Sequence, residues 1–273
     1  MALPSPHMRW RQLALAAQGL GARRQFGQGL AGTLAAIEHL GYVQIDTLSV
    51  VARAHHHVLW SRVPGYAPQH LNQLSSAGNI FEYWFHAAAY LPMRDYRFAL
   101  PRMLSFRRGE SPYFRSVDKA LMAEILARVR GEGVLKTRDL KESTKGKGVW
   151  WDHGPGRRAL DKLFMQGDLM ILERKGMEKR YALPEQVLPP EVNQQEPTVD
   201  DMAAYLLDNA MRAHGVFTFG QLLHLRTGKP LRKAMRELLQ ARLEQGAVHK
   251  LDDPAHPDTY AVAAQPRAER LSP

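Results

Sequence analysis

The sequence predicts a mainly α-helical protein with small β-hairpins, an α+β fold built from tandem winged helix-turn-helix repeats. Three observations lead to this prediction. Apolar residues recur at helical spacing over most of the chain. A pattern of helix, short helix, long helix and hairpin occurs twice in the second half, and both copies carry basic residues at corresponding positions.

Composition narrows the class of protein. The 273 residues are 45% hydrophobic and 23% charged, as in a globular protein with a buried core. A net charge of +10 and a pI near 9.9 are typical of nucleic-acid binding, although ribosomal and membrane-surface proteins share them. Without cysteine there is no disulfide framework and no thiolate metal site. We find no signal peptide and no apolar run that could span a bilayer, so we expect a cytoplasmic protein without membrane contact.

Glycines bound the predicted elements of the N-terminal part. Residues 30–40 place Leu34, Ile37 and Leu40 on one helix face, and Gly41 ends that helix. The predicted elements of this part are helix 8–22, helix 30–40, strand 43–46, helix 47–62, helix 68–77, an aromatic segment at 82–92 and a basic helix at 93–108.

The strand at 43–46 has two interpretations. Its alternation puts Tyr42, Gln44 and Asp46 on one side, with Val43 and Ile45 on the other. The amide of Gln44 and the carboxylate of Asp46 then share a face, roughly 6–7 Å apart at the backbone. Such a pair can position and activate a water molecule. Asp46 is equally well placed to be the N-cap of the predicted helix 47–62.

The predicted helix 47–62 contains three consecutive histidines, at positions 55–57. Successive helical residues point about 100° apart, so these imidazoles cannot converge on one ion. We therefore expect these histidines to make phosphate contacts or to pack against neighbours, and not to bind a metal. We also expect no cofactor. The apolar stripe that we expect this helix to bury consists of Val50, Val51, Ala54, Val58 and Leu59. Three basic side chains lie off the stripe, namely Arg53, His57 and Arg62.

The repeat in the second half is visible within the sequence itself. From the glycine that closes the long helix to the tyrosine of the last strand there are 14 residues in both copies, Gly167 to Tyr181 and Gly246 to Tyr260. The elements expected in the first copy are a helix ending at 131–133, a short helix at 137–141, a long helix at 154–167 and strands at 169–172 and 179–183. Those expected in the second are a helix at 199–213, a short helix at 219–225, a long helix ending at 246 and strands at 247–251 and 259–262.

Charge favours DNA as the partner of these copies. In a winged helix the long helix enters a DNA groove and the hairpin touches the backbone. The first copy has Arg157, Arg158 and Lys162 on its long helix and Arg174, Lys175, Lys179 and Arg180 in its hairpin, and the second has Lys229, Arg232, Lys233 and Arg236. Those that we expect to contact DNA are Arg157, Arg158, Lys162, Lys179, Arg232, Lys233 and Arg236. Winged helices also mediate protein contacts, which stays as the alternative.

These patterns divide the chain into domains. We predict an N-terminal winged-helix-like domain at 8–110, in which strand 43–46 and a helix replace the wing. A second winged helix follows at 115–190 and a third at 198–264, with a tail at 265–273.

Several motifs resemble those of the YcaQ/AlkZ-type DNA glycosylases, from about residue 8 to the end. The matching segments are Leu40–Thr47, Val51–His56, Leu59–Arg62, Glu82–Ala88, Trp150–Asp152, Arg157–Leu160, Leu163–Phe164 and Gly167–Leu169. The Gln44-x-Asp46 pattern is that of the YcaQ-like branch.

The resemblance implies a tandem winged-helix enzyme that cuts the N-glycosidic bond of N7-alkylated purines and unhooks interstrand crosslinks. Gln44 and Asp46 would be its catalytic pair. No lysine lies in the motif, which implies a monofunctional glycosylase that uses water. The partner would be double-stranded DNA with alkylated or crosslinked purines, bound by a nucleoid-associated monomer. The further residues expected to contact DNA on this basis are Arg53, His57, Arg62, Trp84, His86 and Trp151.

Two positions depart from the family pattern. Ala87 stands where the family usually has Glu, and Leu271-Ser272-Pro273 matches the point where relatives continue into a further domain, which we expect this chain to lack. The alternative function is therefore a non-catalytic tandem winged-helix DNA-binding protein, either a regulator or a truncated, inactive homologue. A protein-interaction module is a third hypothesis.

Overall fold

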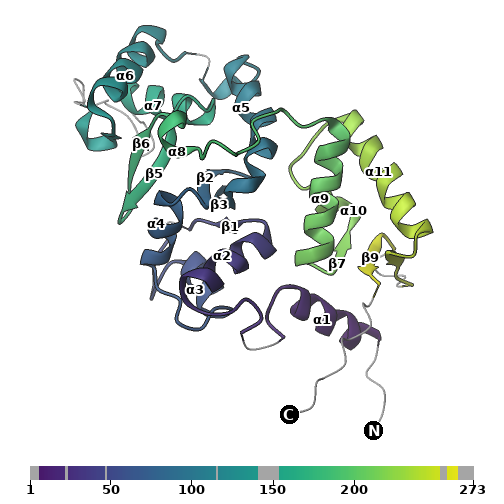
Figure 1. Ribbon diagram of the computed structural model, residues 1–273. Coiled ribbons are helices and arrows are strands. Elements are labelled where there is room, and N and C mark those ends of the chain that lie inside the picture. The colour runs from purple at the N-terminus through teal and green to yellow at the C-terminus, as the bar shows by residue number, and fades with distance from the viewer. Residues whose placement is uncertain are drawn as a thin grey trace. The chain divides into compact units, whose positions relative to one another are not determined.

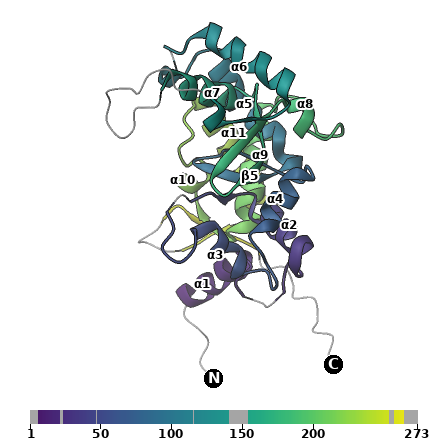
Figure 2. The same cartoon turned by 90° about the vertical axis from the view of Figure 1, so that its left-hand side faces the viewer.

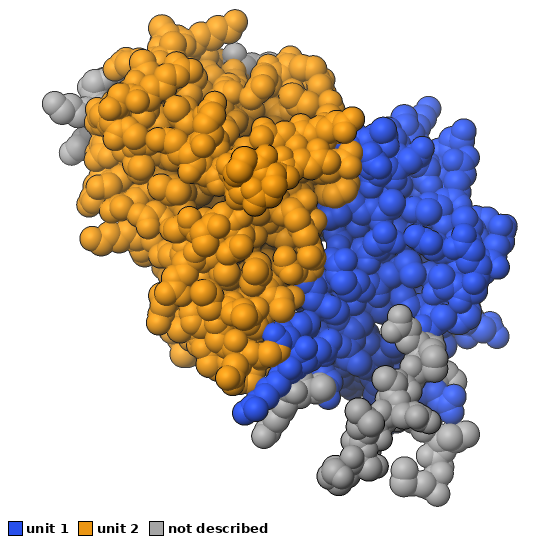
Figure 3. Space-filling model, viewed as in Figure 1, with its two compact units in different colours: residues 1–26, 39–41, 197–273 blue, residues 27–38, 42–196 orange. Residues whose placement is uncertain are grey.

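The computed structural model describes residues 6–21, 24–46, 48–114, 116–140, 154–252 and 257–263. The chain divides into two compact units, one of residues 27–38 and 42–196 and the other of residues 1–26, 39–41 and 197–273 (Figure 3). The larger unit contains most of α2 (Gly29–Leu40) and the elements β1 (Val43–Gln44), α3 (Ala54–Trp60), α4 (Gln69–Ser76), β2 (Ile80–Trp84), β3 (Ala88–Pro92), η1 (Met93–Ala99), α5 (Leu100–Arg107), η2 (Pro112–Phe114), α6 (Lys119–Glu132), β4 (Leu135–Lys136), η3 (Thr137–Asp139), α7 (Pro155–Met165), β5 (Met170–Lys175), β6 (Glu178–Ala182) and α8 (Pro184–Val187). The smaller contains α1 (Pro6–Ala17), α9 (Val199–Ala213), β7 (Val216–Thr218), α10 (Phe219–Leu222), α11 (Lys229–Glu244), β8 (Val248–Lys250) and β9 (Thr259–Val262) (Figures 1 and 2).

The sheets of the described residues share one topology. Their strand orders are β1-β3-β2, β4-β6-β5 and β7-β9-β8, so the first strand of each pairs with the third and the third with the second, always antiparallel. The register is shared too, because Val43 pairs with Tyr90, Leu135 with Tyr181 and Phe217 with Tyr260. Helix, strand, two helices and two strands is the order of a winged helix, which confirms the predicted fold class.

A glycine ends the first helix of each copy in the same way. Gly41, Gly133 and Gly215 have φ of +79°, +83° and +66°, a left-handed backbone that an L side chain adopts only with strain. Two residues after this glycine, each copy has a buried apolar residue in the first strand of its sheet, namely Val43, Leu135 or Phe217. This glycine turns the chain from helix to strand at a fixed spacing.

The first copy has a wing, contrary to the expectation that strand 43–46 and a helix replace it. The aromatic segment forms the hairpin β2–β3, whose turn is Phe85-His86-Ala87, with the Phe85 N–H donating to the Ala87 carbonyl at 3.0 Å. This turn holds no Gly, Asn or Pro, so the usual sequence signal of a hairpin is missing. Cross-strand pairing and burial of the aromatic residues form the hairpin instead.

The long helix predicted at 47–62 is wrong. The helix is α3, which begins only at Ala54 after an extended Arg53 (φ −71°, ψ 146°). Val50 and Val51, expected in the buried stripe, are 98% and 89% exposed. Two adjacent β-branched residues lower helix propensity, and no element of the described residues covers Val50 or Val51.

The helix predicted at 93–108 is divided into η1 and α5. Pro101 lies in the first turn of α5, where its missing N–H is tolerated, but a continuous α-helix would need that donor. The N-terminal helix α1 packs against α9 and β7 of the third copy. The helices of the first copy are therefore α2, α3 and α4.

Within the larger unit, α4 packs along β5 of the second copy. The side chain of Asn72 exchanges two hydrogen bonds with the Arg174 backbone, at 2.7 and 3.1 Å, and the Ser75 hydroxyl donates to the Leu172 carbonyl at 3.0 Å. Nearby, Arg174 forms a bidentate ion pair with Glu82 of β2 at 2.5 and 2.7 Å. These polar contacts join the first two copies. None of the helices in the described part of the chain has the length and apolarity to cross a membrane.

Candidate active site

Gln44 and Asp46 lie at the end of β1, as the alternation predicts. Val43 and Ile45 are buried, whereas the Gln44 side chain is exposed and Asp46 is half-buried. The Ile45 N–H donates to the Ala88 carbonyl at 2.8 Å and so continues the pairing with β3 past Gln44. The amide and the carboxylate therefore come from one anchored segment.

Asp46 is not the N-cap of a helix at residue 47. Its Oδ1 accepts the Leu48 N–H at 3.0 Å, closing a local turn, and its own N–H donates to His55 Nδ1 at 3.2 Å. Oδ2 accepts no hydrogen bond from the described residues. One carboxylate oxygen thus fixes the side chain and the other is left for solvent or substrate.

His86, at the tip of the β2–β3 hairpin, contacts the other half of the pair. Its Nε2 lies 3.1 Å from Gln44 Oε1, which orients the amide. The ring meets Tyr42 edge-on at 5.1 Å, and Tyr42 stacks on Phe85 at 4.7 Å between ring centroids. Burial raises the pKa of Tyr42, so its hydroxyl stays protonated. The amide, imidazole and two aromatic rings form one continuous wall.

His55 is neutral and accepts a hydrogen bond from the backbone N–H of Asp46. The pKa of His55 is lowered to about 4, chiefly by burial and additionally by the neighbouring His56, Arg53 and Arg174, against the opposing effect of Asp46. A neutral Nδ1 can accept the Asp46 N–H, as the geometry requires. Sequence reasoning missed this role because it considered metal binding, phosphate contacts and packing for His55, but not a hydrogen bond to the Asp46 backbone.

The predicted DNA contacts near this site differ in their surroundings. Arg53 is half-buried, and its Nε has no hydrogen-bond partner in the described part of the chain. Arg62 is half-buried, donates to the Val58 carbonyl at 2.9 Å and has a pKa lowered by burial. His57 is exposed at the edge of Trp60, and Trp84 is exposed beneath the Arg102 guanidinium.

The cations of α7 and β6 are held by protein partners. Arg157 pairs with Asp161 at 3.1 Å, Arg158 donates to the Ser116 hydroxyl at 3.2 Å and Lys162 donates to the Phe114 carbonyl at 3.3 Å. Lys179 lies over the Phe164 ring, 5.0 Å from its centroid, and burial lowers the pKa of its ammonium. Trp151 lies outside the described residues.

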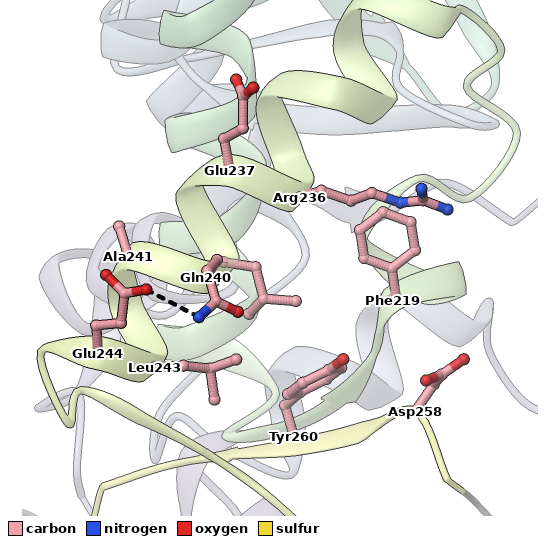
Figure 4. Close-up of a pocket in the computed structure, with 10 residues that line it drawn as sticks. Phe219, Arg236, Glu237, Gln240, Ala241, Leu243, Glu244, Asp258 and Tyr260 are labelled. Carbon is pink, nitrogen blue, oxygen red and sulfur yellow. Dashed lines mark hydrogen bonds between the residues drawn. The ribbon is translucent and has the colours of Figure 1, made fainter.

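The cations of α11 are more exposed. Arg232 and Arg236 both lie over Phe219, 5.6 and 5.5 Å from the ring centroid, and Lys233 is an exposed partner of Glu237 at 3.7 Å. Beside them a hollow of about 660 Å³ lies between the second half of α11 and β9. In Figure 4 the Arg236 guanidinium covers the Phe219 ring, while Tyr260 lines the opposite wall. The aromatic support holds both guanidinium groups at the surface.

No cluster of three or more potential metal ligands occurs among the residues that the structure describes. The site contains a carboxylate, an amide and an imidazole on a rigid sheet edge. These groups can orient a water molecule and stabilise a developing positive charge.

Comparison with known proteins gives the family. The model of the DNA glycosylase AlkZ-like family matches residues 37–273. Among solved structures, the chain is similar to the Streptomyces sahachiroi DNA glycosylase AlkZ, with a TM-score of 0.61 and 16% identity over 93% of this chain and 70% of that chain. At this identity the structural likeness concerns the fold, while the family match covers most of the sequence. This chain belongs to the AlkZ-like DNA glycosylase family.

Proposed function

We propose that this protein is a monofunctional DNA glycosylase that hydrolyses the N-glycosidic bond of N7-alkylated purines, including those in interstrand crosslinks. The observation that carries the proposal is the pair of Gln44 and Asp46 at the end of β1, with Asp46 Oδ2 open and Gln44 oriented by His86. Membership of the family indicates the reaction class, and these two residues are the groups that we propose to act in the reaction.

The reaction does not require the protein to activate the leaving group. A purine alkylated at N7 is cationic and departs as a neutral base, so no proton has to be delivered to it. The sugar becomes positively charged as the bond breaks, and the Asp46 carboxylate stabilises that charge electrostatically.

Water is the nucleophile in this proposal. Asp46 accepts the proton of the attacking water while the Gln44 amide, fixed by His86, orients its lone pair toward the anomeric carbon. The segment Leu40–Thr47 holds no lysine that could form a Schiff base with the sugar. The products are the free base and an abasic site.

Binding of duplex DNA is assigned to exposed and partly exposed basic side chains. We place phosphate contacts on α11 because Arg232, Lys233 and Arg236 project from one helix at groove-binding spacing. Arg53 and His57 would serve the same purpose near Asp46. Such a monomer would act in the cytoplasm, on the nucleoid.

Base release tests the proposal directly. On duplex DNA containing 7-methylguanine, Asp46→Asn is expected to slow release at least about a hundredfold, while duplex affinity changes by less than about threefold. Asparagine can still accept the Leu48 N–H, so the local turn is kept. Borohydride trapping should yield no covalent complex. A wild-type protein that binds duplex but releases no base would support the non-catalytic alternative.

A further inference from the structure

Three large aliphatic side chains face water directly after Asp46. Leu48, Val50 and Val51 are 76%, 98% and 89% exposed. Single exposed aliphatics are common on protein surfaces, but three within four residues form a patch that soluble proteins usually reserve for a contact. A partner that binds here has to present an apolar surface to these side chains next to the Asp46 carboxylate.

The patch belongs to a connection found only in the first copy among the described winged helices. In the second and third copies the first strand runs directly into the next helix, from Lys136 to Thr137 and from Thr218 to Phe219. In the first copy, nine residues separate Gln44 from Ala54. The winged helix itself does not need this segment, because the other copies form their sheets without it.

The base of the connection is fixed although its tip is exposed. The Ile45 N–H donates to Ala88, the Asp46 N–H to the buried His55 and the Leu48 N–H to the Asp46 carboxylate. Leu48 is thereby tied to the side chain proposed to act on the sugar. An apolar tip on a rigid base has the form of a wedge.

Duplex DNA offers a matching environment at this position. The N-glycosidic bond of a stacked, paired nucleotide is poorly accessible, and enzymes that act on it unstack or extrude the nucleotide. Apolar side chains inserted between base steps are one means of unstacking. The neighbouring Arg53 carries a cation at the far end of the connection, as approach to a phosphate backbone requires.

We infer that Leu48, Val50 and Val51 form an apolar wedge that enters the base stack beside the damaged nucleotide and unstacks it next to Asp46. The inference rests on the proposed function, since it gives the wedge the same substrate. It adds a positioning role for residues outside the Gln44–Asp46 pair.

The test separates unstacking from chemistry. Full-length Asp46→Asn protein is mixed with a duplex that carries 2-aminopurine beside 7-methylguanine, and the rise in 2-aminopurine fluorescence reports unstacking. The second variant adds Leu48→Asn, Val50→Thr and Val51→Thr, which keep side-chain size but not apolarity. Leu30→Ala, in α2, removes another exposed aliphatic and is the matched control. Leu48→Met keeps the apolar bulk.

The expected result is a rise in fluorescence with Asp46→Asn and with its Leu30→Ala and Leu48→Met derivatives. The polar triple substitution in the same background is expected to abolish this rise. In the active background, the triple substitution should slow base release from a paired lesion about tenfold or more, and from a mismatched, already loosened lesion much less. Equal fluorescence for Asp46→Asn with and without the triple substitution, together with equal release rates for the triple variant and wild type in the active background, would overturn the wedge. Fluorescence that rises although the wild-type protein releases no base would support the wedge and contradict the proposed function.

Discussion

Substitution of Glu82 by Gln is expected to destabilise the larger unit strongly. Glu82 lies on β2 and Arg174 on β5, and their side chains are only 5% and 7% exposed. Burial alone lowers the pKa of Arg174, but the hydrogen bonds and charge of Glu82 outweigh it and the pKa is raised. Glutamine preserves shape and one acceptor, yet leaves the guanidinium buried without a counter-charge.

The magnitude follows from that unpaired charge. Removing one partner of a buried ion pair costs about 3–5 kcal/mol, a large share of the roughly 5–15 kcal/mol that holds a domain folded. With a urea m-value of about 3 kcal/mol/M, the unfolding midpoint should fall by about 1–1.7 M. Replacing both residues by Leu and Met should cost far less than the sum of the single changes.

Tryptophan fluorescence during urea unfolding is a suitable assay, because Trp60 and Trp84 belong to the larger unit. Glu178→Gln is the matched control, since Glu178 pairs with Arg138 at 2.9 Å on the surface and should contribute at most about 1 kcal/mol. If Glu82→Gln moved the midpoint no further than Glu178→Gln, the buried pair would not hold the two copies together.

Three further predictions address pH, backbone and salt. The folded-state pKa of His55 is about 4 against 6.5 unfolded, so the unfolded state binds more protons between these values and stability is lost as pH falls through them. Between about pH 7.5 and 5 the wild type should lose about 2 kcal/mol more than His55→Asn in urea unfolding, and parallel curves would contradict this. Gly133→Ala should lower the free energy of unfolding by about 1–2 kcal/mol through its φ of +83° alone. Gly215→Ala should lower it more, since a Cβ there meets the Ala17 side chain at 2.8 Å. Equal shifts of the melting temperature for the two variants would refute the difference. Arg232→Ala and Arg236→Ala should each reduce the slope of log duplex affinity against log salt by about 1, and an unchanged slope would remove these residues from the interface.

The sequence was sufficient for the repeat because its signals are local. Helix-ending glycines such as Gly167 and Gly246 lie at a fixed distance from the last strand, and the strand order follows from that arrangement. Alternation around Gln44 and Asp46 likewise predicted which side chains leave the core. These features depend on backbone conformation and period, which neighbouring residues determine.

The remainder depended on partners distant in the chain. Glu82 is buried in an aromatic segment because Arg174, 92 residues away, neutralises it. Val50 and Val51 fit the apolar stripe of a helix, but no element in the described part of the chain covers them, and they lie before α3. The role of His55 depends on its burial and on its bond to the Asp46 backbone. The local pattern contained none of these contacts.

The junction between first strand and second helix tolerates a change in chain length without loss of register, since Val43 pairs with Tyr90 just as Leu135 pairs with Tyr181. The register of the first sheet therefore does not depend on the length of the connection that follows β1. Within the connection, substitutions at the exposed Leu48, Val50 and Val51 should cost little stability, whereas the buried Ile45 belongs to the core. Directed evolution of substrate range would begin most profitably there, and grafting the connection between Lys136 and Thr137 would ask whether a second copy can host it.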